Sequence, residues 1–376
     1  PFYDGPVIYV PDASRAVGVA QNLVSETANT YLADLADEYE TIRQRHAARQ
    51  ATPLISIEQA REAKPTFDWA NYTPPRPKFI GRRMFKNFDL ADLALYIDWT
   101  PFFQTWSLFG HYPQILDDEI VGEQAKKVFA DGQAMLKRII DGRWLTANGV
   151  MAYYPANQVN DDDIEVYRDE TREEVLFTWR GLRQQGVKRE GVSNKCLADF
   201  IAPRESGVMD YIGLFAVTAG LGIEKKENEF IAQQDDYSAI MFKSLADRLA
   251  EAFAEALHAR ARIDLWGYAP DEMLTNDEMI AEKYRGIRPA PGYPACPEHV
   301  VKKEMFEVLQ ADEIGMILTE SFAMHPAASV SGFYFSHPDS QYFSVGLIGE
   351  DQLRDYLARC DRTEADLRRS LAPVIG

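Results

Sequence analysis

A chain of 376 residues, of which 46% are hydrophobic and 12% aromatic, can bury a large core, so general disorder is excluded. Its 58 acidic and 40 basic residues give a formal charge of −18, which argues against a nucleic-acid partner, because phosphates need clustered lysine and arginine. No apolar run approaches the roughly 18–20 residues that span a membrane. Three scattered cysteines without a CxxC pair favour neither a disulfide framework nor a structural zinc site. We therefore expect a cytoplasmic protein with no nucleic-acid and no membrane partner.

The first 25 residues predict one strand followed by one helix. "PVIYV" (6–10) is typical of a short buried strand, and "SRAVGVAQNLVS" after it is typical of a helix with Ser14 as its N-cap. Such a βα unit belongs in a parallel sheet, yet no partner strands follow. The start also lacks an initiator Met and a signal-peptide pattern. We interpret residues 1–25 as the end of an upstream domain, cut from a longer protein.

Residues 26–64 predict a helical linker. "ETANTYLADLADEYETIRQRHAARQ" (26–50) is a charged helix with its apolar residues on one side, and a short helix is expected at 57–63. The stretch "PTFDWANYTPPRPKF" that follows contains four prolines and is typical of a loop. We place the start of the main domain, 65–376, within it.

The main domain predicts an α+β fold. Helices are expected at 90–108 (with a break at Pro101), 119–142 and 235–263, and as two short helices over 350–372. Strands are expected at 150–157, 163–169, 173–179, 210–218, 316–320, 329–336 and 341–348. Because the strands are grouped between helices rather than alternating with them, we expect a mixed, largely antiparallel twisted sheet with flanking helices.

The common enzyme motifs are absent from this sequence. No GxGxxG stands between a predicted strand and a helix, and "GLGIEK" (220–225) has only two of the glycines. GxxxxGK[ST], HExxH and GxSxG are also missing. Three histidines, His299, His325 and His337, are too far apart in sequence to form a metal set, and a structural hydrogen-bonding role is expected for each.

The stretch "GIRPAPGYPACPEH" (286–299) cannot be a helix or a central strand, because its four prolines lack amide donors. Arg288 offers a planar fork of donors for a carboxylate or phosphate, Gly292 permits close approach or a positive φ, and Tyr293 can stack on a heterocycle or face a cation. The prolines would hold these groups in place before a ligand arrives. A proline-rich surface loop, with Arg288 paired to a nearby carboxylate, remains the alternative.

Two further stretches are rich in aromatic residues. In "YIDWTPFFQTW" (96–106), Asp98 either contacts a ligand ammonium or hydroxyl group or caps the helix that follows it. "SGFYFSHPDSQYFSV" (331–345) predicts two strands joined by the turn "SHPDS", and aromatic residues in such a hairpin usually belong to a sheet core.

These stretches resemble the C-terminal activation domain of cobalamin-dependent methionine synthase. "YIDWTPFFQTW", "CLADFIAP", "DYIGLFAVTAG", "GIRPAPGYPACPEH" and "TESFAMHPAASVSGFYFSHPDSQYFSV" occur in that family's order, and the resemblance covers nearly all of 65–376. "RPAPGYPACPEH" carries the family's RxxxGY signature for S-adenosylmethionine. "PVIYVPDASRAVGVAQNLVS" is similar to the last strand and helix of the family's cobalamin-binding domain.

The resemblance implies a reactivation function. The family's domain binds S-adenosyl-L-methionine and gives its methyl group to cob(II)alamin, with one electron from a flavodoxin-type partner, in an enzyme that methylates homocysteine to methionine. Its own cobalamin-binding domain is the other implied partner. The cobalt-ligating DxHxxG motif, the zinc cysteines of the homocysteine domain and the folate barrel are absent from this sequence. The isolated chain is therefore not expected to make methionine, and zinc is expected only in the missing homocysteine domain.

The resemblance also implies the site residues, all of them binding and none catalytic. Arg288 is expected to hold the methionine carboxylate and Asp98 its ammonium group. The other positions implied to contact S-adenosylmethionine are Ala290, Gly292, Tyr293, Tyr342, Phe343 and Glu251. Ala13 falls at a position that touches cobalamin in the family. For Glu251, which shares a helix side with Asp247 and Glu255, a solvated helix face is the alternative.

A rival interpretation is a docking module for the cobalamin domain and the reductase, with S-adenosylmethionine as a structural ligand. An acidic flavodoxin would need a local basic patch, for which "FIGRRMFKNF" (79–88) and "KKEMF" (302–306) are the candidates.

Overall fold

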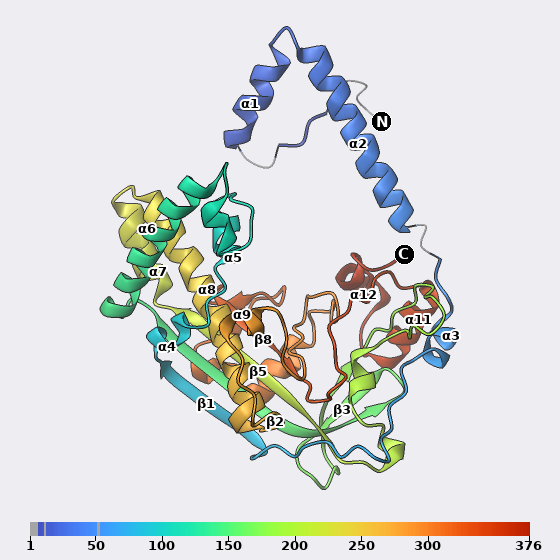
Figure 1. Ribbon diagram of the computed structural model, residues 1–376. Coiled ribbons are helices and arrows are strands. Elements are labelled where there is room, and N and C mark those ends of the chain that lie inside the picture. Colours follow the sequence, from blue (N-terminus) through green and yellow to red (C-terminus); the bar gives the residue numbers. More distant parts are fainter. Residues whose placement is uncertain (1–6, 11–12, 51–52) are drawn as a thin grey trace. The chain divides into compact units, whose positions relative to one another are not determined.

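The computed structural model describes residues 7–10, 13–50 and 53–376 (Figure 1). It divides into two compact units, the residues up to 54 and residues 55–375. In the smaller unit, α1 (Ala13–Leu23) and α2 (Ala28–Gln50) confirm the two predicted helices, although α1 begins one residue before Ser14, the expected N-cap. No helix in the described part of the chain is long and apolar enough to cross a membrane.

The strand predicted over 6–10 is wrong for residues 7–10, and residue 6 lies outside the described part. Residues 7–10 have no regular structure, and Val7 and Tyr9 are 70% and 79% exposed. The Tyr9 amide donates to the Tyr39 hydroxyl at 3.0 Å instead of to a neighbouring strand. A single strand cannot satisfy its backbone groups without a partner, so the apolar pattern alone does not form one.

Residues 55–64, which the sequence places in the linker, are part of the larger unit. The helix α3 (Ile57–Glu62) begins with a capping box formed by Ser56 and Gln59. The Ile57 amide donates to Asp351 at 2.7 Å, and the Ile55 amide donates to the Gln185 carbonyl at 2.9 Å. These bonds connect α3 to residues about 130 and 294 positions away.

The larger unit is built on an antiparallel sheet of six strands, which confirms the predicted α+β class. The strand order is β4-β3-β2-β5-β8, and β1 pairs with the part of β2 that β3 leaves free. The strands are β1 (Gly81–Phe88), β2 (Thr146–Val159), β3 (Asp163–Tyr167), β4 (Val175–Arg180), β5 (Asp210–Leu221) and β8 (Ser329–Tyr334). A separate pair is formed by β6 (Ile317–Leu318) and β7 (Met324–His325).

Both faces of the sheet are covered. Alternate residues of β2 enter two cores: Met151 and Tyr153 on the α8 side, Val150 and Ala152 on the α10 side. In Figure 1, α5, α6, α7 and α8 gather at one end of the sheet, and α11 and α12 lie beyond β3. The helices are α4 (Leu90–Ala94), α5 (Thr100–Thr105), α6 (Gly122–Gly142), α7 (Ile223–Ala232), α8 (Asp236–Arg260), α9 (Asn276–Ile280), α10 (Lys302–Leu309), α11 (Glu350–Arg359) and α12 (Glu364–Leu371).

The helix expected over 90–108 is interrupted a few residues before Pro101, where the break was expected. The chain leaves α4 after Ala94 and re-enters a helix at Thr100, so Pro101 occupies the first turn of α5. A proline is tolerated there because the amide it lacks has no partner within the helix.

The strand predicted over 341–348 is wrong. This stretch has no regular structure apart from a single bridge between Ile348 and Ile375. Its backbone is bonded elsewhere: the Val345 amide donates to the Pro294 carbonyl at 2.9 Å, and the Gln184 side chain donates to the Ser344 carbonyl at 2.6 Å. The hairpin is therefore replaced by an irregular segment attached to the proline-rich loop.

A buried network of ion pairs stabilises the end of the sheet at which β2 is connected to β3. Arg183 has a fully buried side chain and donates to Asp162 at 2.7 Å and to both oxygens of Asp199 at 2.7 and 2.9 Å. Arg61 of α3 extends the network by pairing with Asp162 and with Asp355 of α11. Three segments distant in sequence thus share one set of charges.

Removing Asp199 should be costly, because it leaves the buried Arg183 with Asp162 as its remaining carboxylate partner and removes two of its hydrogen bonds. We expect Asp199→Ala to lower the free energy of unfolding by about 3–5 kcal/mol. The control Arg369→Ala removes a side chain that is 81% exposed, and should change it by less than about 0.5 kcal/mol. Urea unfolding at pH 7 measures both; a loss below about 1 kcal/mol for Asp199→Ala would contradict the structural role of the network.

Candidate functional site

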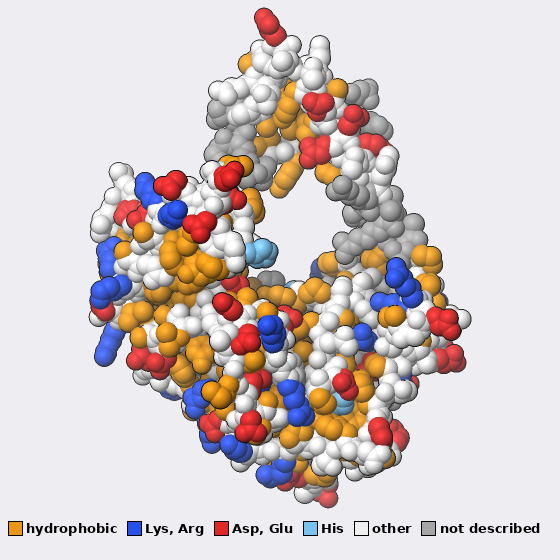
Figure 2. Space-filling view, viewed as in Figure 1, with side chains coloured by type: hydrophobic (Ala, Val, Ile, Leu, Met, Phe, Trp, Pro, Cys, Tyr) orange, Lys and Arg blue, Asp and Glu red, His pale blue; other side chains and the backbone are white. Residues whose placement is uncertain are grey.

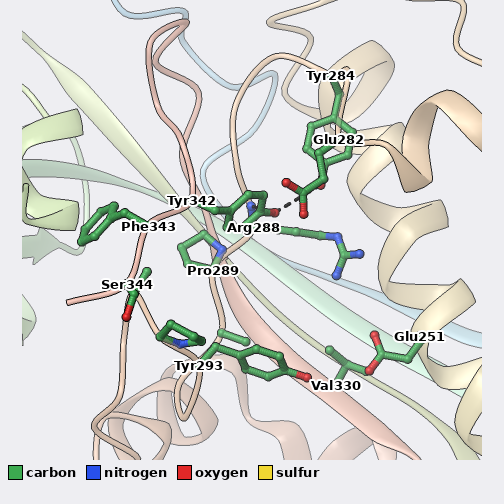
Figure 3. Close-up of a pocket in the computed structure, with 13 residues that line it drawn as sticks. Glu251, Glu282, Tyr284, Arg288, Pro289, Tyr293, Val330, Tyr342, Phe343 and Ser344 are labelled. Atoms are coloured by element: carbon green, nitrogen blue, oxygen red, sulfur yellow. Dashed lines mark hydrogen bonds between the residues drawn. The ribbon is translucent and has the colours of Figure 1, made fainter. Parts of the chain in front are cut away.

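A cavity of about 550 Å³ lies where the loop 286–299, α8 and the segment 342–344 meet (Figure 3). A second cavity of about 350 Å³ adjoins it. The two share five lining residues, and the second one also reaches Tyr96 and Asp98. The shared residues are Glu251, Glu282, Tyr284, Arg288 and Tyr293.

The loop 286–299 is fixed to the edge strand β8. Ile287 and Phe335 exchange backbone hydrogen bonds of 3.1 and 3.0 Å, and the Phe333 amide donates to the Pro289 carbonyl at 2.9 Å. The loop therefore continues the sheet by a few bonds, although its prolines prevent a regular strand. Arg288 stands between the two bonded positions.

Gly292 shapes the turn of this loop rather than lining the cavity. Its φ is +96°, and a β-carbon at this position would lie 2.1 Å from the His299 ring. Its amide donates to the Cys296 carbonyl at 2.7 Å. A side chain is excluded both by the backbone conformation and by His299. The turn presents Tyr293, which is 58% exposed, to both cavities.

Arg288 is the cation at the junction of the two cavities. Its Nη2 donates to Glu255 at 2.7 Å, and its backbone amide donates to the Tyr342 hydroxyl at 3.0 Å. The side chain is 20% exposed, and within the described part of the chain Nε has no hydrogen-bond partner. Burial lowers the pKa of Arg288, but the Glu255 carboxylate outweighs this effect, so the pKa is raised.

Two predicted contacts, Tyr342 and Phe343, line the larger cavity. The Tyr342 hydroxyl lies 3.2 Å from that of Tyr284. Burial raises the pKa of both tyrosines, so both hydroxyl groups stay protonated at neutral pH and can donate hydrogen bonds. Ala290 lines the same cavity beside Arg288.

Asp98 and Glu251 form an acidic side of the smaller cavity. Asp98 Oδ1 accepts from the Thr100 amide at 2.9 Å, so Asp98 both bonds the start of α5 and borders the cavity. Figure 3 shows the Arg288 guanidinium and the Tyr293 hydroxyl directed toward the side where Glu251 lies. Glu282 faces the same space, and burial together with Glu255 raises its pKa, against the effect of Arg288.

The structure therefore brings together seven of the nine predicted residues around two joined cavities. Gly292 lies in the turn of the loop and lines neither cavity. Ala13 is the first residue of α1 in the smaller unit, and its side chain lies outside the described part. The seven are Asp98, Glu251, Arg288, Ala290, Tyr293, Tyr342 and Phe343. Among the described residues, no group of three or more His, Cys, Asp or Glu side chains could hold a metal ion.

Sequence reasoning missed Glu255, Glu282 and Tyr284. Glu255 was named only as a neighbour of Glu251 on a helix side for which a solvated face was the alternative, but it is only 7% exposed and pairs with Arg288. The signal was present, because Glu251 and Glu255 are four residues apart on α8 and share a side of the helix. The neighbouring Asp247 is exposed, so the solvated face holds for that residue.

His337, in the turn that leads to Tyr342, has the structural role expected for it. Its ring packs against Phe67, Trp69 and Tyr72, with ring centroids 4.5, 5.1 and 4.8 Å away. Nδ1 accepts from the Asp339 amide at 3.1 Å, which leaves the proton of the neutral ring on Nε2. Burial lowers the pKa of His337 to about 4.

Two comparisons place this chain in a class of known proteins. The fold is an α+β domain with a cavity at the edge of its sheet. The family model described as "Vitamin B12 dependent methionine synthase, activation domain" matches residues 89–361. The crystal structure of the MetH reactivation domain bound to AdoHcy is 53% identical, with a TM-score of 0.83. That match covers 86% of this chain and 99% of the other. The chain belongs to the family of vitamin B12-dependent methionine synthase activation domains, which confirms the resemblance.

The His337 turn gives a pH-dependent stability. The folded pKa of about 4 lies below the unfolded value of 6.5, so the unfolded chain binds a proton first and stability is lost as the pH falls from 6.5 to 4. The full difference is about 3 kcal/mol. His337→Asn keeps an acceptor for the Asp339 amide but does not titrate. We expect its stability deficit relative to the unmodified protein to shrink by about that amount between pH 7 and pH 4.

Urea unfolding at pH 7, 5.5 and 4 measures this difference. A deficit that stays constant with pH would show that the His337 ring is not held neutral by its surroundings.

Proposed function

We propose that this chain binds S-adenosyl-L-methionine in the two joined cavities and presents its methyl group for the reductive methylation of cob(II)alamin, with an electron from a flavodoxin-type partner. The observation that carries the proposal is Arg288, whose guanidinium lies at the junction of two cavities that the carboxylates Glu251 and Glu282 also line. A volume of about 550 Å³ falls in the range of about 300–1,000 Å³ of small-molecule sites.

The chemistry of the lining residues matches the groups of this ligand. Arg288 would hold the amino-acid carboxylate through its planar fork. Asp98 and Glu251 would face the ammonium and sulfonium charges, which accounts for an acidic wall in the smaller cavity. Tyr293 and Phe343 offer aromatic faces for the adenine ring.

S-adenosylmethionine, when bound, supplies a methyl group already activated by the sulfonium charge, so the chain needs no general base. The residues contribute binding, orientation and exclusion of water. Tyr284 and Tyr342 remain protonated donors at neutral pH, which suits hydrogen bonding to a ligand rather than proton abstraction. This inventory supports a binding role for every residue of the site.

A docking module with S-adenosylmethionine as a structural ligand is the second candidate. Of its basic stretches, Arg83, Lys86 and Lys303 are exposed, whereas Lys302 and Arg82 are bonded within the fold. Lys302 is 6% exposed and donates to the Phe322 carbonyl at 3.0 Å, so it is not part of a surface patch. Arg82 of β1 donates to the Leu309 carbonyl at 2.9 Å. On the face that Figure 2 presents, acidic and basic side chains of the larger unit are interspersed.

Substitution of Arg288 tests the proposed site. We expect Arg288→Ala to weaken S-adenosylmethionine binding on the order of 100-fold, and Arg288→Lys about 10-fold, because lysine keeps the charge but not the planar fork. Isothermal calorimetry measures both variants. The control ligand is 5′-methylthioadenosine, which lacks the carboxylate and should bind all three proteins alike. Unchanged S-adenosylmethionine binding by Arg288→Ala would disprove the site.

Binding without turnover is the second expectation. S-adenosylmethionine at 100 times its dissociation constant should stabilise the chain by about 2.7 kcal/mol, which raises the unfolding temperature by several degrees. The same chain, given homocysteine and methyltetrahydrofolate, should form no methionine. A thermal scan and a product assay check the two parts, and steady methionine formation would contradict the second.

A further inference from the structure

Behind Arg288 lies a row of buried side chains whose charges alternate. Glu255 pairs with Arg288 at 2.7 Å, and its other oxygen lies 3.7 Å from Nη1 of Arg262. Nε of Arg262 donates to Glu272 at 2.6 Å. Arg262 is fully buried, and the Glu255 and Glu272 side chains are each 10% exposed. The row runs from the cavity to the loop that precedes α9.

The backbone places Arg262 in this row through a change of helix type. After α8 the chain forms a π-helical turn over Ala261–Leu265, in which the Trp266 amide bonds to the Ala261 carbonyl at 3.0 Å. The guanidinium of Arg262 then lies 4.4 Å above the Tyr284 ring, next to Glu255. Such single π turns inside or after α-helices occur frequently at functional sites.

The charged side chains of this row are buried, and burial of a charge is unfavourable in free energy. Neither Oε1 of Glu255 nor the two terminal nitrogens of Arg262 has a hydrogen-bond partner within the described part of the chain. Burial of charges with incomplete hydrogen bonding is unfavourable for stability, and apolar side chains would pack there at lower cost. A role in the site accounts for the row better than stability does.

We propose that Glu255 is a positioning residue, which orients the Arg288 guanidinium for the ligand carboxylate and is itself held by Arg262 and Glu272. This inference rests on the proposed function, in which Arg288 binds that carboxylate. Glu255 accepts a hydrogen bond from Nη2 of Arg288, so the long arginine side chain loses its freedom before the ligand arrives. Preorganisation of this kind reduces the entropy lost on binding.

The test compares two ligands on matched variants. AdoHcy carries the amino-acid carboxylate, and 5′-methylthioadenosine does not. Glu255→Gln should weaken AdoHcy binding on the order of 10-fold and change 5′-methylthioadenosine binding by less than about twofold. Asp247→Asn, at an exposed position of the same helix that lines neither cavity, is the control and should affect neither ligand. Calorimetry gives the dissociation constants, and unfolding without ligand shows whether each variant is folded.

A double-mutant cycle separates this inference from the proposed function. In the Arg288→Ala background, Glu255→Gln should add almost no further loss of AdoHcy binding, because its effect passes through Arg288. If Arg288→Ala itself leaves AdoHcy binding intact, the proposed function fails. If Arg288→Ala weakens AdoHcy binding but Glu255→Gln does not, or weakens both ligands equally, the positioning role is overturned. Tighter AdoHcy binding by Glu255→Gln would also overturn it, since Glu255 would then compete with the ligand.

A second variant keeps the test decisive if Glu255→Gln fails to fold. Glu272→Gln acts at the outer end of the row, away from the lining of either cavity. It should weaken AdoHcy binding about threefold, with 5′-methylthioadenosine unchanged, because the coupling passes through one intervening charge. Equal effects on both ligands, or none on either, would overturn the proposal.

Discussion

The ion pair between Arg288 and Glu255 connects a proline-rich loop to the 25-residue helix α8, and the candidate site depends on it. Each partner alone would be a buried charge at a high energetic cost. Together they join two segments whose order in the chain gives no sign of proximity. The cavities open around this pair because the loop, α8 and the segment 342–344 all converge on it.

The rigidity of the loop comes from two independent sources. Its prolines restrict the backbone before folding, and the bonds of Ile287 and Pro289 to β8 fix it afterwards. Gly332 of β8 permits this approach, because a β-carbon there would lie 2.6 Å from the Pro289 carbonyl. The stretch that sequence analysis left open between a ligand clamp and a surface loop is thus a nearly strand-like extension of the sheet edge.

The helices and strands that the sequence predicted are those in which the pattern of buried residues is regular. The strands β2 and β5 are buried along nearly their whole length and the helix α8 has a continuous buried side, and their apolar patterns predicted them. The strand β1 was missed because it is half-exposed and polar, whereas 341–348 has a strand-like composition but bonds to the loop instead. The periodicity of apolar residues indicates which side chains are buried, but it does not indicate which other segment will form hydrogen bonds with the backbone.

Glu255 shows where the same limit applies to the site. Three acidic residues at 247, 251 and 255 repeat every four positions, a pattern normally read as a solvated face. The structure separates them by depth: Asp247 is exposed, Glu251 borders the cavities and Glu255 is buried. The difference arises because Arg288, which is distant in the chain, and Arg262, in the π-helical turn directly after α8, approach only the last of the three. A carboxylate becomes part of a site when a distant cation reaches it, and that information lies in the tertiary fold rather than in the helix that carries the residue.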